Sequence, residues 1–428
     1  MTGDKISCPS RVKLTTVCCI FLFMVTLSAR AAEDSVAKLA QDSGCARAIE
    51  WIVKNTGWVT DQQIRLTEIP APEFNETQRG LALNQLLASA GFNVRTDELG
   101  NVIAERPGSD PKSVILFAAH LDTVFPAGTD VRVKRVGARL NAPGISDNGA
   151  GLAALAGLAR ALSESRIRTT KTIVLAGDVG EEGEGNLRGM RALVDYYGPR
   201  LAAVIAIDGP STDHITTQGI ASRRIEVTIT GPGGHSWSDF GAANAITALS
   251  RGIVRFSAIR LPEAPRSSFN FGVIEGGQSV NSIPARASVK VDVRSESEDQ
   301  LGRIESALRD AMQAGVRDEV SVSRSSRESM QVNFRSLGTR PAGVLPENSA
   351  LLQAIRDVDR FLGTRSRLER SSTDANIPLS LGIPAVAVGG GGLGAGSHTL
   401  NEWYDPSGRE LGLKRLFLTS LVLAGVEP

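Results

Sequence analysis

The sequence predicts an α/β protein in which a second, smaller domain is inserted into the first. Short apolar runs at Ser113–Ala118, Thr172–Ala176 and Ala202–Ile207 are typical of strands buried in a sheet that is covered on both faces. Leucines recur at helical spacing between Leu152 and Leu162, so a helix lies between two of these strands. The length of 428 residues exceeds the usual size of one domain and suits two.

The inserted domain is indicated by a change of pattern near Arg223. Alternating polar and apolar stretches and two helical stretches then follow in the order β-α-β-β-α-β, which is the ferredoxin-like split motif. The predicted elements cover Arg224–Thr230, Ala242–Phe256, Ser268–Glu275, Ala285–Arg294, Gln300–Ala314 and Glu319–Ser323. We therefore assign residues 220–332 to the inserted domain, and residues 33–219 and 333–428 to the first domain.

The pattern of residues 1–31 is typical of a secretory signal peptide. Cationic residues precede an almost wholly apolar run over residues 14–27, and Ala29 and Ala31 supply the small residues of a cleavage site. The run is short for a membrane span, although an uncleaved anchor is the alternative. After cleavage only Cys45 remains, which excludes an intrachain disulfide. We expect an exported protein, periplasmic or secreted, that is not held in a membrane.

The composition argues against a nucleic-acid partner. Lys and Arg number 47, Asp and Glu number 46, and the formal net charge is +1. Nucleic-acid binding needs a basic surface that neutralises phosphates, and these numbers leave no such excess of positive charge. The apolar fraction of 42% and the charged fraction of 22% are those of a soluble globular protein.

Acidic residues and histidines follow the predicted buried strands. In chain order they are His120, Asp122, Asp147, Asp178, Glu181, Glu182, Asp208 and His398, of which Asp147 precedes a helix and His398 follows a glycine-rich run. Ligands bind at the carboxyl ends of the strands in α/β sheets, so we expect these side chains to share a site. Taken singly, each has an ordinary alternative; Asp147, for example, could simply cap the following helix.

Imidazoles combined with carboxylates suit Zn²⁺, and also Mn²⁺ or Co²⁺. Two histidines and three carboxylates can hold two metals if one carboxylate bridges them, and such a pair lowers the pKa of a shared water towards ~7. A glutamate outside the ligand set can then take the proton from water. His120 and Asp122 lie two residues apart on a strand, so Asp122 can orient the imidazole.

Several motifs occur in a fixed order along the chain: HLDTVFP, GISDNGAGLAAL, GDVGEEGEG, IDGP, GPGGHS and SHTLNEW. With these motifs the chain resembles the aminoacylase, peptidase T and glutamate carboxypeptidase family of co-catalytic zinc hydrolases. The resemblance covers nearly all of the mature chain. It implies a three-layer zinc-peptidase catalytic domain with a mixed sheet, and a ferredoxin-like lid domain through which a homodimer forms.

The resemblance also implies roles for the site residues. His120 and Asp208 would bind the first metal, Glu182 and His398 the second, and Asp147 would bridge the two. Glu181 would be the general base and then the general acid. The peptide bond after the bridging aspartate, here Asp147–Asn148, is typically cis in the family.

Further residues of the inserted domain match family positions. His235 would reach the active site of the other subunit and help to stabilise the oxyanion. Asn281 and Arg294 match positions that contact substrate, and an arginine fork suits a substrate carboxylate. These assignments depend on a homodimer formed through the inserted domain.

The leading hypothesis is a metallopeptidase that acts on small peptides. Asp208, where related carboxypeptidases usually have Glu, and the segment Glu68–Pro72 resemble aminopeptidases of the peptidase T type. A carboxypeptidase or N-acyl-amino-acid deacylase on the same site is the alternative. A non-catalytic binding protein with this fold is an alternative from another class, although such relatives usually lose ligands or the base.

Overall fold

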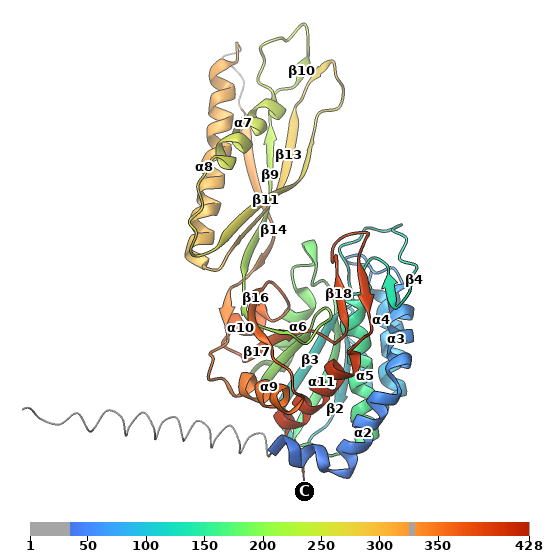
Figure 1. The fold of residues 1–428 in the computed structure, drawn as a ribbon. Coiled ribbons are helices and arrows are strands. Elements are labelled where there is room, and N and C mark those ends of the chain that lie inside the picture. The colour runs from blue at the N-terminus through green and yellow to red at the C-terminus, as the bar shows by residue number, and fades with distance from the viewer. Residues whose placement is uncertain (1–34, 325–329, 428) are drawn as a thin grey trace, which may run out of the picture.

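The computed structural model describes residues 35–324 and 330–427, which form a large domain and a smaller one (Figure 1). The predicted signal peptide, residues 1–31, lies outside the described residues. Within them, no helix combines the length and the apolar character that a membrane span needs. Cys45 is buried in the core of the large domain, and burial raises the pKa of its thiol to about 12, so it packs as an unreactive side chain.

The large domain is built on a mixed sheet in the order β1-β2-β6-β3-β7-β17-β8-β15, with β16 beside β8. The central strands β6, β3, β7 and β17 are parallel. Strand β2 runs antiparallel to β1 and β6, and β8 runs antiparallel to β17 and β15 but parallel to β16. The strands are β1 (Asn93–Thr96), β2 (Val102–Arg106), β3 (Asp110–His120), β6 (Lys171–Asp178), β7 (Leu201–Ile207), β8 (His214–Gly219), β15 (Gly343–Val344), β16 (Arg367–Ser371) and β17 (Ala385–Val388).

Helices cover both faces of this sheet. As a result, β3 is buried at every residue from Val114 to His120. The helices are α2 (Ser43–Lys54), α3 (Thr56–Thr67), α4 (Thr77–Ser89), α5 (Gly149–Ser165), α6 (Arg188–Tyr197), α9 (Ala350–Phe361), α10 (Asn376–Ser380) and α11 (Arg409–Ala424). The buried helix α5 is rich in alanine and glycine. At Gly157 a Cβ would come within 2.9 Å of Leu413, so the glycine lets α11 pack closely against α5.

A small antiparallel sheet lies at one edge of the large domain, in the order β18-β19-β5-β4. Its strands are β4 (Lys134–Val136), β5 (Arg139–Asn141), β18 (Leu393–Ala395) and β19 (Trp403–Asp405). The connection from β18 to β19 contains His398, and β5 leads into the turn that precedes α5. Two segments far apart in the chain are therefore brought to the same end of the central sheet.

The small domain has the predicted β-α-β-β-α-β order, and its sheet order is β11-β13-β9-β14. Its elements are β9 (Ala221–Thr230), α7 (Ala245–Ser257), β11 (Ser267–Gly276), β13 (Arg286–Ser295), α8 (Glu298–Val322) and β14 (Gln331–Arg340). The two helices pack on the sheet around a separate apolar core that includes Phe256, Leu308 and Met312. A short ladder of β10 (Gly234–His235) and β12 (Ser282–Ile283) lies at the far end (Figure 1).

The strand predicted over Glu319–Ser323 is wrong, because α8 continues to Val322. The end of α8 packs against α7: a Cβ at Gly315 would come within 2.6 Å of the Ala248 carbonyl oxygen, and Glu319 accepts a hydrogen bond from Arg251 over 3.1 Å. These contacts extend the helix through a stretch whose valines favour strands. The last strand is instead β14, which pairs with β9 along its whole length. Val332, where the inserted domain was predicted to end, therefore lies inside β14.

Candidate active site

The five predicted metal ligands converge at the carboxyl ends of the central strands. His120 ends β3, Glu182 follows β6, and Asp208 follows β7. Asp147 lies in the turn before α5, and His398 lies between β18 and β19. The structure thus gathers into one place side chains that the sequence separates by up to 278 residues, from His120 to His398.

Asp147 lies between the two histidines. Its Oδ1 is 3.1 Å from His120 Nε2, and its Oδ2 is 3.2 Å from His398 Nε2. His398 Nε2 is also 2.9 Å from Glu182 Oε1, and His120 Nε2 is 4.0 Å from Asp208 Oδ1. Each carboxylate oxygen of Asp147 therefore faces a different group of ligand atoms, as a bridging residue requires.

Three groups of potential ligands lie among the described residues: His120, Glu181 and Glu182 form one, and the other two share Asp147. Of those two, one consists of His120, Asp147 and Asp208, and the other of Asp147, Glu182 and His398; within each, the ligand atoms lie within 4.8 Å of one another. Nitrogen and carboxylate oxygen donors in this number suit two divalent cations of the zinc, manganese or cobalt type. The residues present therefore fit a dinuclear metal centre.

The electrostatics of the cluster agree with this fit. Burial raises the pKa of Asp208 to about 8, and the nearby Asp147 carboxylate adds to the rise. Burial likewise raises the pKa of Glu182 to about 7, although its hydrogen bond to His398 opposes the shift. The carboxylates repel one another in a partly desolvated site, and cations bound among them would relieve that repulsion.

The turn that presents Asp147 is held by Glu402, which sequence reasoning missed. The buried Glu402 carboxylate accepts hydrogen bonds from the backbone N–H groups of Gly144 (2.8 Å), Ser146 (2.7 Å) and Asp147 (2.9 Å). The peptide bond Asp147–Asn148 is cis, as predicted. Glu402 belongs to the SHTLNEW motif, from which only the histidine was assigned, so the signal was present in the sequence.

Asp122 contacts His120, and its carboxylate also contacts the backbone of Glu181 and Glu182. His120 Nδ1 is 3.1 Å from the Asp122 carbonyl oxygen and 3.8 Å from Oδ1. The two carboxylate oxygens of Asp122 accept hydrogen bonds from the N–H groups of Glu181 (3.0 Å) and Glu182 (2.8 Å). Asp122 therefore orients the imidazole mainly through its backbone and fixes the Glu181–Glu182 turn through its side chain.

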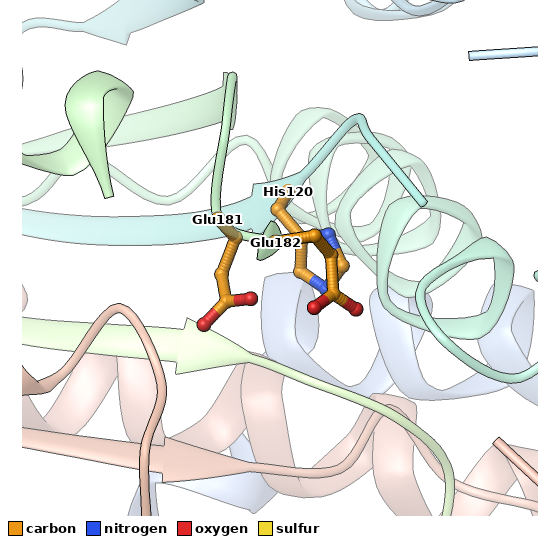
Figure 2. Close-up of side chains that lie close together, drawn as sticks. All are labelled: His120, Glu181 and Glu182. Atoms are coloured by element: carbon orange, nitrogen blue, oxygen red, sulfur yellow. The ribbon is translucent and has the colours of Figure 1, made fainter. Parts of the chain in front are cut away.

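Glu181 lies beside the ligand cluster, and its side chain diverges from those of Glu182 and His120 (Figure 2). Its Oε1 accepts a hydrogen bond of 2.8 Å from Nη1 of Arg340, whose Nη2 donates to the Glu181 carbonyl. Arg340 is 3% exposed, so this is a buried, charge-assisted contact. Sequence reasoning missed Arg340 because the last strand of the small domain was misplaced.

Two further buried carboxyls lie behind Glu181. Asp178, predicted to share the site, ends β6 and faces Asp374 of the Ser372–Asn376 loop. Burial raises the pKa of Asp178 to about 6 and holds that of Asp374 well above its ordinary value. Neither residue is among the ligand atoms of the cluster. The segment that contains Asp374 resembles, in sequence, a family loop near the substrate pocket, but the pairing of Asp374 with Asp178 was not predicted.

A cavity of about 320 Å³ opens above the cluster. Its walls include Arg224, Arg294 and Arg340, together with Ser371 and Ser372. Arg294, predicted to contact substrate, is among the residues that line the cavity. The metal side of the cavity is thus acidic, and the side facing the small domain is cationic.

His235 and Asn281 do not line this cavity within one chain. They lie together at the β10 end of the small domain, where the Ser236 N–H donates to the Asn281 carbonyl over 3.0 Å (Figure 1). His235 is exposed, and its Nδ1 accepts a hydrogen bond from the Trp237 N–H. Their predicted contact with substrate therefore depends on a second copy of the chain.

Two imidazoles, three carboxylates and an adjoining glutamate at strand ends define a metal-dependent hydrolase. Residues 116–419 match the model of Peptidase family M20/M25/M40. The chain belongs to this family of hydrolases, whose members generally depend on a dinuclear metal centre.

Individual relatives agree with the family assignment. A putative succinyl-diaminopimelate desuccinylase DapE of Mycobacterium tuberculosis is 25% identical over 333 residues, which cover 76% of this chain and 88% of the relative. Carboxypeptidase G2 of Pseudomonas sp. (strain RS-16) is 29% identical over 232 residues, which cover 50% of this chain and 54% of the relative.

Solved structures with the same fold include aminopeptidase PepT of Bacillus cereus, with a TM-score of 0.66 and 20% identity over 87% of this chain and 99% of that one. A tripeptidase of Staphylococcus aureus has a TM-score of 0.67 and 20% identity over 86% of this chain and 98% of that one. At this identity the likeness establishes the fold, including the mixed sheet.

Proposed function

We propose that this protein hydrolyses an amide bond in a small substrate that carries a carboxylate, either a short peptide or an N-acyl amino acid. One observation carries the proposal: two ligand groups share Asp147, and they face Arg294 across a cavity of about 320 Å³. The acidic side is suited to metals and the cationic side to a substrate anion. The scissile bond would lie between them.

His120, Asp208 and Asp147 would hold one cation, and Glu182, His398 and Asp147 the other. When bound, the two cations supply Lewis-acid polarisation of the scissile carbonyl and make water more acidic. Glu181, which the ligand groups sharing Asp147 do not use, accepts the proton of the attacking water and returns it to the leaving nitrogen. The Asp122 carboxylate keeps Glu181 in place by accepting a hydrogen bond from the backbone N–H of Glu181.

Arg294 is the residue best placed to recognise a substrate carboxylate. Its Nε donates to Asp292 over 2.6 Å, its side chain is 43% exposed, and the residue lines the cavity. Among the described residues that line the cavity, each carboxylate belongs to the metal cluster or is paired with Arg340, which leaves a substrate amine no free anionic partner. The lining therefore supports recognition of the substrate through its carboxylate.

The direction of cleavage is a separate question. The name carboxypeptidase G2 supports hydrolysis next to a free carboxyl terminus, whereas the names of the PepT and tripeptidase structures support the aminopeptidase expected from Asp208. We give the carboxylate-directed activity first place because it follows from the arginines of this chain. The aminopeptidase activity is the second candidate.

A substrate panel with an Arg294→Gln variant tests this proposal. It pairs free dipeptides, tripeptides and N-acetyl amino acids with the same compounds bearing a C-terminal amide. We expect hydrolysis of the free acids, and a KM raised roughly tenfold or more in Arg294→Gln because a charged hydrogen bond is lost. The exposed Arg303 serves as the control, and Arg303→Gln should behave as wild type.

Two results would count against carboxylate recognition. Equal hydrolysis of amidated and free-acid substrates would show that the enzyme does not recognise a substrate carboxylate. Cleavage that requires a free amino terminus, with no effect of Arg294→Gln, would replace the proposal with the aminopeptidase.

We further propose a homodimer in which His235 completes the active site of the partner. The exposed position of His235, outside the cavity of its own chain, supports this arrangement. Strand β11, at the edge of the small sheet, exposes Ile274 and offers a surface for pairing. Export is likewise proposed from residues 1–31 alone, and the amino-terminal sequence of the mature chain would test it.

Complementation tests the shared site. His235→Ala and Glu181→Gln should each be nearly inactive alone. Mixed and refolded in equal amounts, they should regain about a quarter of wild-type activity, because half of the random dimers contain one intact site of two. No regain, despite verified exchange of subunits, would show that His235 does not act across an interface.

A further inference from the structure

The segment from Gly180 to Leu187, which we call the base loop, carries Glu181 and Glu182 and adopts an unusual backbone. Gly180 and Gly183 have φ values of 67° and 48°, and the non-glycine residues Asn186 and Leu187 have φ values of 57° and 58°. Left-handed conformations of this kind persist in non-glycine residues only where surrounding contacts determine them. The position of Glu181 therefore depends on whatever holds the loop.

The large domain holds one side of the base loop. Asp122 binds the N–H groups of Glu181 and Glu182, as described above. One carboxylate oxygen of Glu73 accepts hydrogen bonds from the N–H groups of Glu184 (2.7 Å) and Gly185 (3.2 Å). At Gly183 a Cβ would overlap the Glu73 carboxylate, so the loop lies directly against this anchor.

The small domain holds the other side through adjacent strands of its sheet. Arg224 of β9 donates to the Gly183 carbonyl, and Lys290 of β13 lies 2.5 Å from a carboxylate oxygen of Glu184. At the end of β14, the Thr339 N–H donates to the Asn186 side chain over 2.8 Å. The base loop is therefore held between the two domains, by hydrogen bonds and an ion pair from residues of both.

Of the three small-domain residues just described, Arg224 is the one that lines the cavity of the active site. Its side chain is 15% exposed, and its Nε lies 3.6 Å from Asp292 Oδ1, which fixes the guanidinium. It lines the same cavity as Glu181. Arg223, the preceding residue, points to the opposite side of the strand and contacts Glu305 and Glu298 within the small domain. The two neighbouring arginines thus offer a matched comparison.

We propose that Arg224 is a positioning residue for Glu181. Through Arg224, the position of the small domain against the base loop determines where the proton acceptor lies. This inference rests on the proposed function, in which Glu181 accepts the proton from water. Arg224 acts through the Gly183 carbonyl and the loop backbone. It contributes to the rate of the chemical step and not to substrate affinity.

Amide hydrogen exchange of the base loop, followed by mass spectrometry, tests the proposal together with steady-state kinetics. Arg224→Gln should make exchange at residues 181–185 about tenfold faster, because the loop loses a partly buried charged donor. It should lower kcat about ten- to a hundredfold with KM little changed, since a misplacement of roughly 1 Å has that cost. Arg223→Gln should leave both measurements at wild-type values.

Two further variants separate positioning from loss of the fold. Arg224→Lys keeps a donor and should recover part of the kcat, and Lys290→Gln should give a smaller effect of the same kind. Unchanged exchange and unchanged kcat in Arg224→Gln would overturn the proposal. A raised KM with normal kcat would also overturn it, because Arg224 would then bind substrate directly.

The proposed function can fail separately. In that case the wild type would hydrolyse no member of the substrate panel. The exchange comparison between Arg224→Gln and Arg223→Gln would still decide whether Arg224 holds the base loop.

Discussion

Replacing Glu181 by glutamine should lower kcat by about a thousandfold, which is within the range expected for the loss of a general acid–base group. The glutamine keeps the size of the side chain and can still contact Arg340, but it cannot accept a proton from water. Because Glu181 is outside the two ligand groups that share Asp147, the variant should bind as much metal as wild type. Hydrolysis rates and metal content should be measured on the same preparations.

The exposed Glu347 provides the control for this substitution, and Glu347→Gln should be fully active. A Glu181→Gln variant that kept more than a tenth of the wild-type kcat with full metal content would refute the proton-acceptor role. Loss of metal in the variant would instead identify Glu181 as a ligand, and the assignment of the cluster would have to change.

Replacing Asp147 by asparagine should have the second large effect, because both ligand groups depend on this one carboxylate. The amide offers a single neutral oxygen, so it cannot bridge two cations between His120 and His398. We expect bound metal to fall from two ions per chain to at most one, and kcat to fall by at least about a thousandfold. Treatment of wild type with a chelator should reproduce this loss.

Stability provides a readout of the same substitution that does not depend on substrate. A metal present at a hundred times its dissociation constant stabilises the folded chain by about 2.7 kcal/mol, so chelation should lower the melting temperature of wild type. Asp147→Asn should respond much less to chelation. Asp213, which lies 3.0 Å from His214 outside the site, provides the matched control. An Asp147→Asn variant that kept both metals would contradict the bridging assignment.

The ligand cluster could be predicted from sequence because parallel strands deliver their terminal residues to one edge of a sheet. Apolar runs marked the strands, and the residues after them were His120, Glu182 and Asp208. The position of His398 could not be derived in this way, because it lies on a connection outside the central sheet. It was found by resemblance, and the structure places it beside Asp147.

Other parts of the site were beyond the reach of local patterns. Arg340 and Arg224 belong to the small domain, and each contacts the base loop across a long separation in sequence. Such contacts arise from how the two domains meet, which hydrophobic periodicity does not encode. The same limit explains the error at Glu319–Ser323, where packing against α7 extends α8 through β-branched residues.

The central claim is that two cations lie on either side of Asp147. Anomalous diffraction from crystals grown with Zn²⁺ tests it most directly. The account predicts two peaks, one among His120, Asp147 and Asp208 and the other among Asp147, Glu182 and His398. A single peak, or peaks that do not share Asp147, would contradict it.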